Sequence, residues 1–438
     1  MSAMHVLTHA RTFDSLRKHR NYRLYFGGQV VSITGTWVQN VAQSWLVVEL
    51  SHSSPLAVGV LAACQFGPYA VFGLLGGVIV DRLDYRRTLL FTQSAMMCAA
   101  AVLGILALTH VAQVWMVDLI AALYGTVLVV DTPVRQSFTF QMVGRRELPN
   151  AVALNSSLFN SARIMGPALG GVIIASAGVG ICFLINAVSY VAVLVGLALM
   201  DDADLYPVQR ADRGTSMVAG IREGLRYARS EPRVRIVLAM LLVVATIGIN
   251  FNVLLPVLAR GTLHSGAEVF GLLSACFGAG ALAGALVTAS MGRAVMPVLV
   301  AAAGAFGVFE VLLAFQASIA GAAIVLALVG VSFSLYTANS NATLQLAAPD
   351  QLRGRVMALY GYVFIGTAPL GGLLAGWMAD QGGTRLAFLV AGIAAVLASI
   401  YGMLRTGTAG RARGRLVRRM RRGGPPLDIT AGTAVTRE

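Results

Sequence analysis

Residues 125–154 read GTVLVVDTPVRQSFTFQMVGRRELPNAVAL, and residues 330–359 read GVSFSLYTANSNATLQLAAPDQLRGRVMAL. The two stretches match at several positions, for example Thr132 with Thr337. A weak internal repeat between the two halves of a chain is typical of membrane proteins that arose by duplication of a helix bundle. The sequence therefore predicts two related halves.

The composition is that of an integral membrane protein. The chain has 438 residues, of which 57% are hydrophobic and 12% charged, and its mean hydropathy is +0.74. No water-soluble domain of this length sustains such values. The net charge of +14 would suggest nucleic acid as a partner of a soluble protein, but in a membrane protein it indicates arginine-rich cytoplasmic loops. We expect no nucleic-acid partner.

Apolar runs long enough to cross a bilayer predict an all-α membrane protein with twelve transmembrane helices, arranged as two pseudo-symmetric bundles of six. The predicted spans are residues 24–50, 56–80, 88–109, 113–133, 150–177, 179–200, 235–259, 268–290, 294–316, 319–343, 356–379 and 384–404.

Positive charge sets the predicted orientation. Of the 33 Lys and Arg residues, all but Arg163, Arg260 and Arg385 fall in the tails or in loops on one side of this map. Basic loops stay in the cytoplasm, so both termini are expected to be cytoplasmic.

The breaks between spans predict the domain organisation. Residues 1–200 form the N-terminal half and residues 235–404 the C-terminal half. Between them, residues 201–234 form a cytoplasmic linker, in which Ser216 to Arg229 has the spacing of a short amphipathic helix on the inner leaflet. Residues 405–438 are expected to be a basic, disordered cytoplasmic tail that is attracted to anionic lipid.

Several classes of chemistry are disfavoured. The only lysine is Lys18, which is followed by His19, so the chain has no Walker-type phosphate loop. The four cysteines are far apart, and the histidines lie in tails or at the ends of apolar runs. We therefore expect no enzyme activity, no metal and no cofactor.

Glycines recur on every third span. The motif G-x-x-x-G occurs in spans two, five, eight and eleven, as Gly73/Gly77, Gly166/Gly170, Gly280/Gly284 and Gly372/Gly376. Glycines four residues apart form a groove that lets two helix backbones approach closely. Arg163 lies on the same helix face as Gly166 and Gly170, and we expect this face to meet the Gly280/Gly284 groove.

Two motifs carry a family resemblance. The stretch GGVIVDRLDYRR at residues 76–87 and the stretch ARIMGPALGG at residues 162–171 resemble signatures of the major facilitator superfamily. Together with DTPVRQSF at 131–138, the chain is most similar to the drug:proton antiporter branch that contains enterobactin, macrolide and tetracycline exporters. The resemblance implies that spans one, four, seven and ten line a central cavity, and it implies efflux.

The first motif suggests a gate. A carboxylate and guanidiniums at a cytoplasmic helix end can form a charge-paired latch that breaks when the two halves rock, although a plain topological anchor is the alternative. The predicted gating and structural residues are Gly77, Asp81, Arg82, Arg86, Arg87, Asp131, Arg135, Gly166, Pro167, Gly170 and Gly171.

Ionisable residues inside spans are costly and are functional candidates. Asp118 in span four and Glu310 in span nine are the candidates for proton coupling, with structural pairing as the alternative for each. Arg163 in span five should bond carbonyls and amides across the cavity and also contact substrate. Asp131 and Arg135 lie near the inner end of span four, where we expect interfacial solvation or pairing of Asp131.

Polar and aromatic residues on the spans assigned to the cavity are the candidates for substrate binding, although buried amides also serve as contacts between helices. The candidates are Trp37, Asn40, Gln43, Arg163, Asn250, Asn252, Tyr336, Asn339 and Asn341, with Gln65 and Tyr362 as weaker ones.

These features predict a monomeric secondary transporter that exports an amphipathic, drug-like compound in exchange for protons by alternating access. Its partners would be a small-molecule substrate, protons and membrane lipids. A siderophore-specific exporter is the alternative within the class. A non-transporting receptor or a lipid scramblase is the alternative from other classes, but neither requires duplicated halves.

Overall fold

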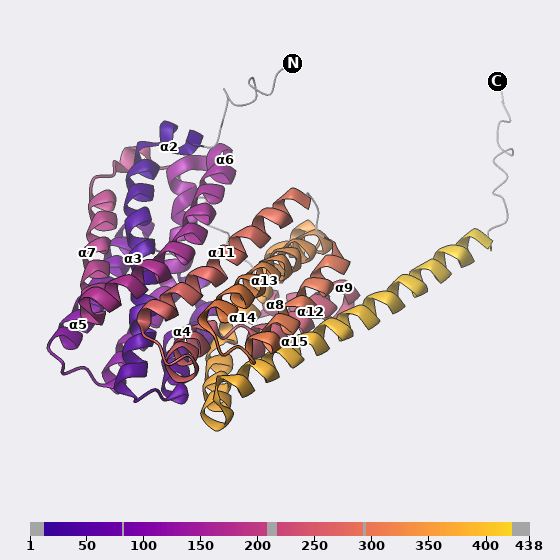
Figure 1. Cartoon of the computed structure of the whole chain (residues 1–438). Coiled ribbons are helices and arrows are strands. Elements are labelled where there is room, and N and C mark those ends of the chain that lie inside the picture. The colour runs from indigo at the N-terminus through magenta and orange to yellow at the C-terminus, as the bar shows by residue number, and fades with distance from the viewer. Residues whose placement is uncertain (1–12, 81–82, 208–216, 292–294, 423–438) are drawn as a thin grey trace, which may run out of the picture.

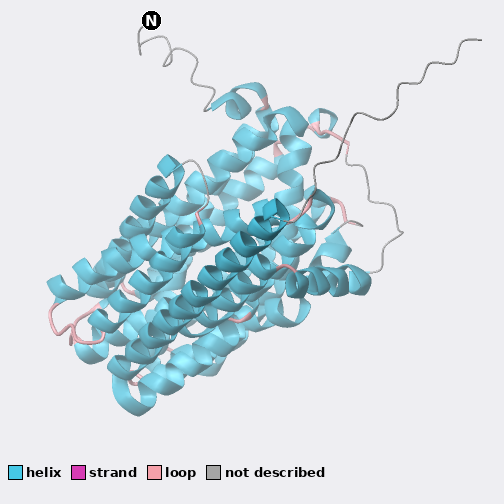
Figure 2. Ribbon diagram, turned by 90° about the vertical axis from the view of Figure 1, so that its right-hand side faces the viewer, coloured by secondary structure: helices cyan, strands magenta, loops and turns pink. Residues whose placement is uncertain are grey.

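The computed structural model describes residues 13–80, 83–207, 217–291 and 295–422. Throughout these ranges the regular structure is helical (Figure 2). The predicted gating residues Asp81 and Arg82 lie outside the described residues, as does the end of the C-terminal tail, residues 423–438.

The first group of helices is built from the N-terminal part of the chain (Figure 1). Its helix α6 is longer than the predicted spans four and five, because the turn expected between them is a single non-helical residue, Gly144, with φ of 69°. Glycine adopts this left-handed conformation without strain. The helices are α2 (Asp14–Lys18), α3 (Arg20–Leu50), α4 (Pro55–Val80), α5 (Tyr85–Leu108), α6 (Val114–Ala177) and α7 (Val179–Ala198).

The second group follows the linker (Figure 1). Its first span is interrupted at Ile249 and Asn250, where the backbone leaves the helical conformation. The helices are α9 (Pro232–Val243), η3 (Val244–Gly248), α10 (Phe251–Val257), η4 (Leu258–Thr262), α11 (Ala267–Met291), α12 (Met296–Leu313), α13 (Ile319–Ala347), α14 (Asp350–Gly366) and α15 (Ala368–Arg422).

The linker contains the short helix η2 (Asp202–Asp204) and the helix α8 (Met217–Ser230), which lies in the segment predicted to be an amphipathic helix. Glu223 of α8 forms an ion pair with Arg355 of α14, and the Tyr227 hydroxyl donates to the carbonyl oxygen of Ala347 at 2.7 Å. The linker helix is thus docked on the second group of helices.

Within the described residues, nine helices are long and apolar enough to cross a membrane. Two of these, Val114–Ala177 and Gln351–Gly407, are kinked at non-helical glycines, which are Gly144 in the first and Gly382 and Gly383 in the second. The C-terminal segment departs from the prediction, because α15 continues as a helix through Arg422 although residues 405–422 were expected to be disordered. Arginine, leucine and methionine are strong helix formers, and no proline occurs in this segment.

The most extensive contacts between the groups are those of α4 with α15 and of α6 with α11, and α14 also packs on α4. Glycines lie where the backbones meet. A Cβ atom on Gly59 would lie 2.5 Å from the carbonyl oxygen of Gly372, and one on Gly171 would lie 2.9 Å from that of Ala267. Only residues without a side chain allow helices to approach this closely.

The expected partner of the Gly280/Gly284 groove was wrong. These glycines face the backbone of α13 at Ala327 and Val331, within their own group. It is Gly278 that lies against α6, where its Cβ atom would be 3.3 Å from the Arg163 carbonyl oxygen. The spacing identified close helix contact correctly, but the rotation of α11 about its axis decides which neighbour each glycine meets.

The contacts of Gly59, Gly171 and Gly376 gather at one end of the molecule. Pro55 begins α4, Ala267 begins α11, and a Cβ atom on Gly376 would lie 2.7 Å from the Pro55 carbonyl oxygen. At the same end, the rings of Trp45 and Phe270 stack between the groups with centroids 6.2 Å apart. The two groups are therefore joined tightly where these helices begin.

We predict that Gly171→Ala destabilises this arrangement, because the added methyl would meet backbone atoms of α11 that cannot move aside. Overpacking of this kind costs about 1–3 kcal/mol. Gly27→Ala is the matched control, since nothing lies within 4 Å of its Cβ position. Thermal unfolding of the purified variants measures the difference, and equal melting temperatures would contradict the backbone contact.

Candidate functional site

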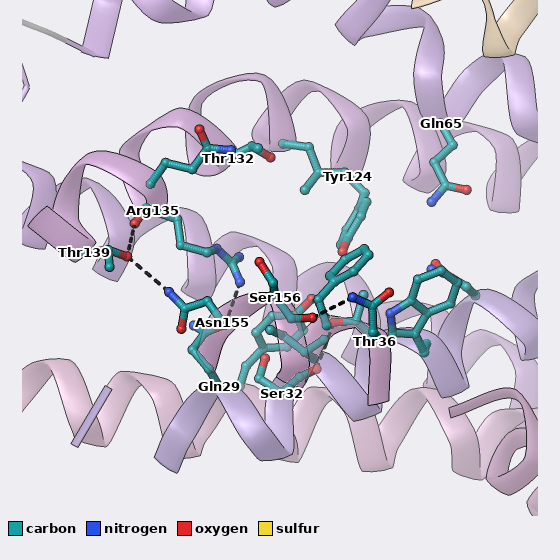
Figure 3. A pocket seen from close by; sticks show the side chains of 18 of the residues that line it. Gln29, Ser32, Thr36, Gln65, Tyr124, Thr132, Arg135, Thr139, Asn155 and Ser156 are labelled. Carbon is teal, nitrogen blue, oxygen red and sulfur yellow. Dashed lines mark hydrogen bonds between the residues drawn. The ribbon is translucent and has the colours of Figure 1, made fainter. Parts of the chain in front are cut away.

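A cavity of about 760 Å³ lies among α3, α4, α6, α7 and α10. All but one of its lining residues belong to the first helix group, the exception being Asn252. Figure 3 shows part of the lining. It consists of Tyr25, Gln29, Ser32, Ile33, Thr36, Trp37, Asn40, Ser44, Gln65, Phe66, Tyr124, Leu128, Thr132, Arg135, Gln136, Thr139, Val152, Asn155, Ser156, Phe159, Asn160, Tyr190 and Asn252.

Helical periodicity explains why these residues meet. On α3, Gln29, Thr36, Asn40 and Ser44 recur every three to four residues or at multiples of that spacing, which places them on one face. The lining residues of α6 from Tyr124 to Thr139 follow the same rule. Each helix therefore presents one polar stripe to the cavity.

Four of the predicted binding and gating residues lie on this surface. They are Trp37, Asn40, Arg135 and Asn252, and the weaker candidate Gln65 joins them. Trp37 packs edge to face against Phe159, with ring centroids 5.7 Å apart. The cavity thus combines aromatic surface with hydrogen-bonding groups.

Sequence reasoning missed most of the polar lining. Gln29, Ser32 and Thr36 share a helix face with Trp37 and Asn40, so the spacing along span one carried the signal. The residues Asn155, Ser156 and Asn160 belong to the first turns of span five, a span that the resemblance did not assign to the cavity.

The other predicted binding residues are absent from the lining of this cavity. Asn250 donates to the carbonyl oxygens of Thr246 and Ile247 at 2.9 and 3.1 Å, and so caps the interruption in the first span of the second group. Asn339 accepts a hydrogen bond from the backbone of Val295, which joins α13 to the start of α12. The remaining residues outside the lining are Gln43, Tyr336 and Asn341, of which Gln43 and Tyr336 are buried.

Arg163 reaches the second helix group. Its guanidinium carbon lies 5.9 Å from the centre of the Phe333 ring on α13, a cation–π contact. Its Nε atom has no hydrogen-bond partner in the described part of the chain. Arg163 was predicted to reach across to the second helix group, and this contact agrees with that prediction. Its partner there is an aromatic ring, whereas we expected carbonyl and amide groups.

Asp131 and Arg135 form a buried network at one end of the cavity. Asp131 Oδ1 accepts from Thr92 Oγ1 at 2.7 Å and from Gln93 Nε2 at 2.8 Å, and its Oδ2 accepts from Arg135. Arg135 Nη1 also donates to Gln29 Oε1 at 2.6 Å. Of the two expectations, pairing is therefore the one found, and the network ties α6 to α3 and α5.

Of the predicted gate, Arg86 and Arg87 can be placed. Arg86 donates to the carbonyl oxygens of Leu197 and Ala198 at 2.9 and 3.0 Å and forms a 2.5 Å ion pair with Asp202. The backbone N–H of Arg87 donates to Asp84, which caps α5. Both contacts stay within the first group and its linker, so in this structure Arg86 fastens α5 to the end of α7.

The two candidate proton carriers lie outside the cavity lining. Asp118 is half-buried on α6, and its Oδ1 atom has no hydrogen-bond partner among the described residues. Glu310 on α12 is fully buried, and neither of its oxygens has such a partner. A Cβ atom on Gly248 would lie 3.5 Å from Glu310 Oε2, which places this carboxyl group beside η3.

The described residues contain no group of three or more His, Cys, Asp or Glu side chains that could hold a metal ion.

Comparison with solved structures agrees with the fold. The nucleoside transporter NupG (D323A mutant) superposes with a TM-score of 0.71 at 11% identity, covering 88% of this chain and 99% of that one. A bacterial homologue of the human lysosomal transporter Spinster, solved in an inward-facing and unoccupied conformation, gives a TM-score of 0.68 at 13% identity over 89% of this chain and 97% of that one.

Sequence relatives cover nearly the whole chain. The staphyloferrin A transporter of Staphylococcus aureus (strain NCTC 8325 / PS 47) is 26% identical, covering 85% of this chain and 93% of that protein. The multidrug efflux pump Tap of Mycolicibacterium fortuitum is 27% identical over 84% and 91%. The macrolide efflux protein A of Streptococcus pyogenes is 22% identical over 86% and 95%.

The family model described as transmembrane secretion effector matches residues 10–413. The resemblance carried by the sequence motifs is thereby confirmed, and the relatives are transporters rather than enzymes. This chain belongs to the transmembrane secretion effector family of the major facilitator superfamily, whose members are membrane transporters.

Proposed function

We propose that the protein is a proton-coupled secondary transporter that exports an amphipathic organic compound through the cavity between α3 and α6. In this proposal the chain crosses a bacterial inner membrane twelve times as a monomer, in two halves of six spans joined by the linker at 201–234. Both termini are cytoplasmic, which places the glycine contacts at the outer end.

The observation that carries the proposal is the combination of a polar cavity with backbone contact between the groups at one end. A carrier that works by alternating access needs a central site that is closed on one side at a time. Tight contact where α4 and α11 begin closes one side. At the other side, the cavity runs toward the start of α3, at Tyr25, and toward the Gly144 kink of α6, at Thr139. We therefore assign this arrangement to the inward-facing state.

Glu310 is our principal candidate for proton coupling. An ionised carboxylate that is buried without partners costs several kcal/mol, so we infer that Glu310 holds its proton in this arrangement. The Glu310 carboxyl group and the Phe306 ring both lie beside the Gly248 position, and the Glu310 side chain is fully buried. Neither of its oxygens has a hydrogen-bond partner in the described part of the chain.

Its position gives Glu310 a route to the substrate site. Glu310 lies beside Gly248, the last residue of η3. The span that contains η3 is interrupted at Asn250, two residues after Gly248, and Asn252 of that span lines the cavity. Straightening or bending of this interruption would move Asn252 and the neighbourhood of Glu310 together. Asp118, which is half-buried and outside the cavity lining, is the second candidate.

The siderophore alternative also has support from the site. Amides and hydroxyls outnumber aliphatic side chains in the lining, where Ile33, Leu128 and Val152 are the aliphatic members. Such a surface suits a large molecule that is rich in hydrogen-bonding groups. A siderophore is therefore our second candidate substrate, and a staphyloferrin A transporter is among the relatives.

The proposal is tested in proteoliposomes with a pH gradient, using radiolabelled erythromycin and radiolabelled staphyloferrin A as separate probes. We expect the gradient to drive accumulation of at least one probe. Accumulation that does not depend on the gradient would contradict antiport. Lipid flipping without flux of either probe would support a scramblase, and binding without flux would support a receptor.

We further predict that Glu310→Gln abolishes gradient-driven accumulation while downhill exchange continues, because glutamine mimics the protonated side chain and cannot release a proton. Glu268→Gln is the control, since Glu268 is an exposed carboxylate at the start of α11. Accumulation by Glu310→Gln at the wild-type level would transfer the coupling role to Asp118, for which Asp118→Asn should then give the same loss.

A further inference from the structure

The charge on the cavity surface is carried by a single side chain. Arg135 is the only charged residue among those that line the cavity. Its side chain is 28% exposed, whereas that of its partner Asp131 is 1% exposed. Figure 3 shows the Arg135 side chain extending from α6 toward Gln29 and Asn155. The ion pair thus presents its positive end to the cavity.

Asp131 is not available to a ligand, because both of its oxygens are occupied. Thr92 and Gln93 donate to Oδ1, and Arg135 donates to Oδ2. The bonds from Thr92 and Gln93 hold the carboxylate against α5. A cationic ligand in the cavity would therefore meet the guanidinium and not the carboxylate.

Two hydrogen-bond donors beside Arg135 lack acceptors. Tyr25 and Gln29 lie one helical turn apart on α3, line the cavity and are almost fully buried. The Tyr25 hydroxyl and the Gln29 amide nitrogen have no hydrogen-bond partner in the part of the chain that the structure describes. The Oε1 atom of Gln29 already accepts from Arg135, so Nε2 is the end of the amide that is left over.

Unpaired buried donors are costly, at about 1–3 kcal/mol each. They are uncommon in native structures, and each one requires an explanation. Here the two lie on the same part of the cavity lining, since Gln29 accepts a hydrogen bond from Arg135 and Tyr25 lies one helical turn from Gln29. Arg135, Gln29 and Tyr25 can all donate hydrogen bonds. Among their atoms that have no partner, only the tyrosine oxygen can also accept one.

We propose that Arg135, Gln29 and Tyr25 form an anion subsite that binds a carboxylate, or an acidic oxygen group of similar charge, on the transported molecule. The inference rests on the proposed transport function and specifies its substrate class. A carboxylate accepts several hydrogen bonds at once and is matched by the planar fork of a guanidinium. Trp37 and Phe159, further along the cavity, provide the apolar surface for the rest of the molecule.

The subsite favours anionic ligands over cationic ones. Asp118 and Glu310 are absent from the lining and Asp131 is enclosed, so the cavity offers a cation no carboxylate among the described residues. Amphipathic acids are therefore bound, and lipophilic cations of the same size are excluded by the guanidinium. A purely structural role for Arg135 would produce no such preference.

The test uses three probes that share one ring system: 2-naphthoate, 2-naphthamide and 2-naphthylmethylammonium. Binding of each to the purified full-length protein is measured by isothermal titration calorimetry at constant pH. We expect 2-naphthoate to bind at least tenfold more tightly than the ammonium compound, with the amide between them. Equal affinities, a preference for the cation, or no binding of 2-naphthoate would overturn the subsite.

Tyr25→Phe removes one proposed donor and leaves the ring in place. Because the lost hydroxyl has no described protein partner, the melting temperature should be unchanged or higher, while the affinity for 2-naphthoate falls about fivefold to tenfold. Tyr336→Phe is the control, since Tyr336 is equally buried and lies outside the cavity lining. An unchanged affinity in Tyr25→Phe, or an equal loss in Tyr336→Phe, would contradict the assignment.

Arg135→Lys keeps a positive charge beside Asp131, so the buried carboxylate remains paired, but it removes the planar fork. We expect at least a tenfold loss of 2-naphthoate affinity and little change for 2-naphthamide. If the lysine variant does not fold, Tyr25→Phe alone decides the matter. Binding is measured without a gradient, so pH-driven export of a cationic compound would leave the transport proposal intact and overturn only the subsite.

Discussion

Backbone contact between α4 and α15, and between α6 and α11, is the interaction on which the rest of the structure depends. At Gly59, Gly171 and Gly271 the missing side chains let helices of the two groups touch through their main chains. In a bilayer, where lipid is as apolar as leucine, such close packing is a principal source of helix association. It joins the groups at one end and leaves the polar stripes of α3 and α6 to face a cavity.

The ionisable residues of the two helix groups differ in whether they have hydrogen-bond or ion-pair partners. In the first group, the charges of Asp131 and Arg135 are satisfied by each other and by Thr92, Gln93 and Gln29. In the second group, Glu310 is buried without any described partner. A satisfied pair resists change, whereas an unpartnered carboxyl group gains stability by changing its surroundings when it ionises. We therefore assign substrate recognition to the first group and proton coupling to the second.

The sequence predicted the helical membrane fold, and it placed several residues of the cavity. Trp37, Asn40 and Asn252 were found because the family resemblance assigns spans one and seven to the cavity, and aromatic or amide side chains inside those apolar runs are unusual. Gly280 was assigned the wrong neighbour, and the Phe333 partner of Arg163 was not foreseen. Spacing along a helix defines a face, but the tilt and rotation that decide which helix meets that face are set by packing of the whole bundle.

The central claim is that a proton on Glu310 favours closure of the end where α4 and α11 begin. Spin labels at Val111 and Ala317, which are exposed in loops at that end of each group, report the separation by double electron–electron resonance in nanodiscs. The account predicts a single short distance at low pH, a second, longer distance that grows as the pH rises, and only the short distance at every pH in Glu310→Gln. Distances that respond to pH equally in wild type and Glu310→Gln would contradict it.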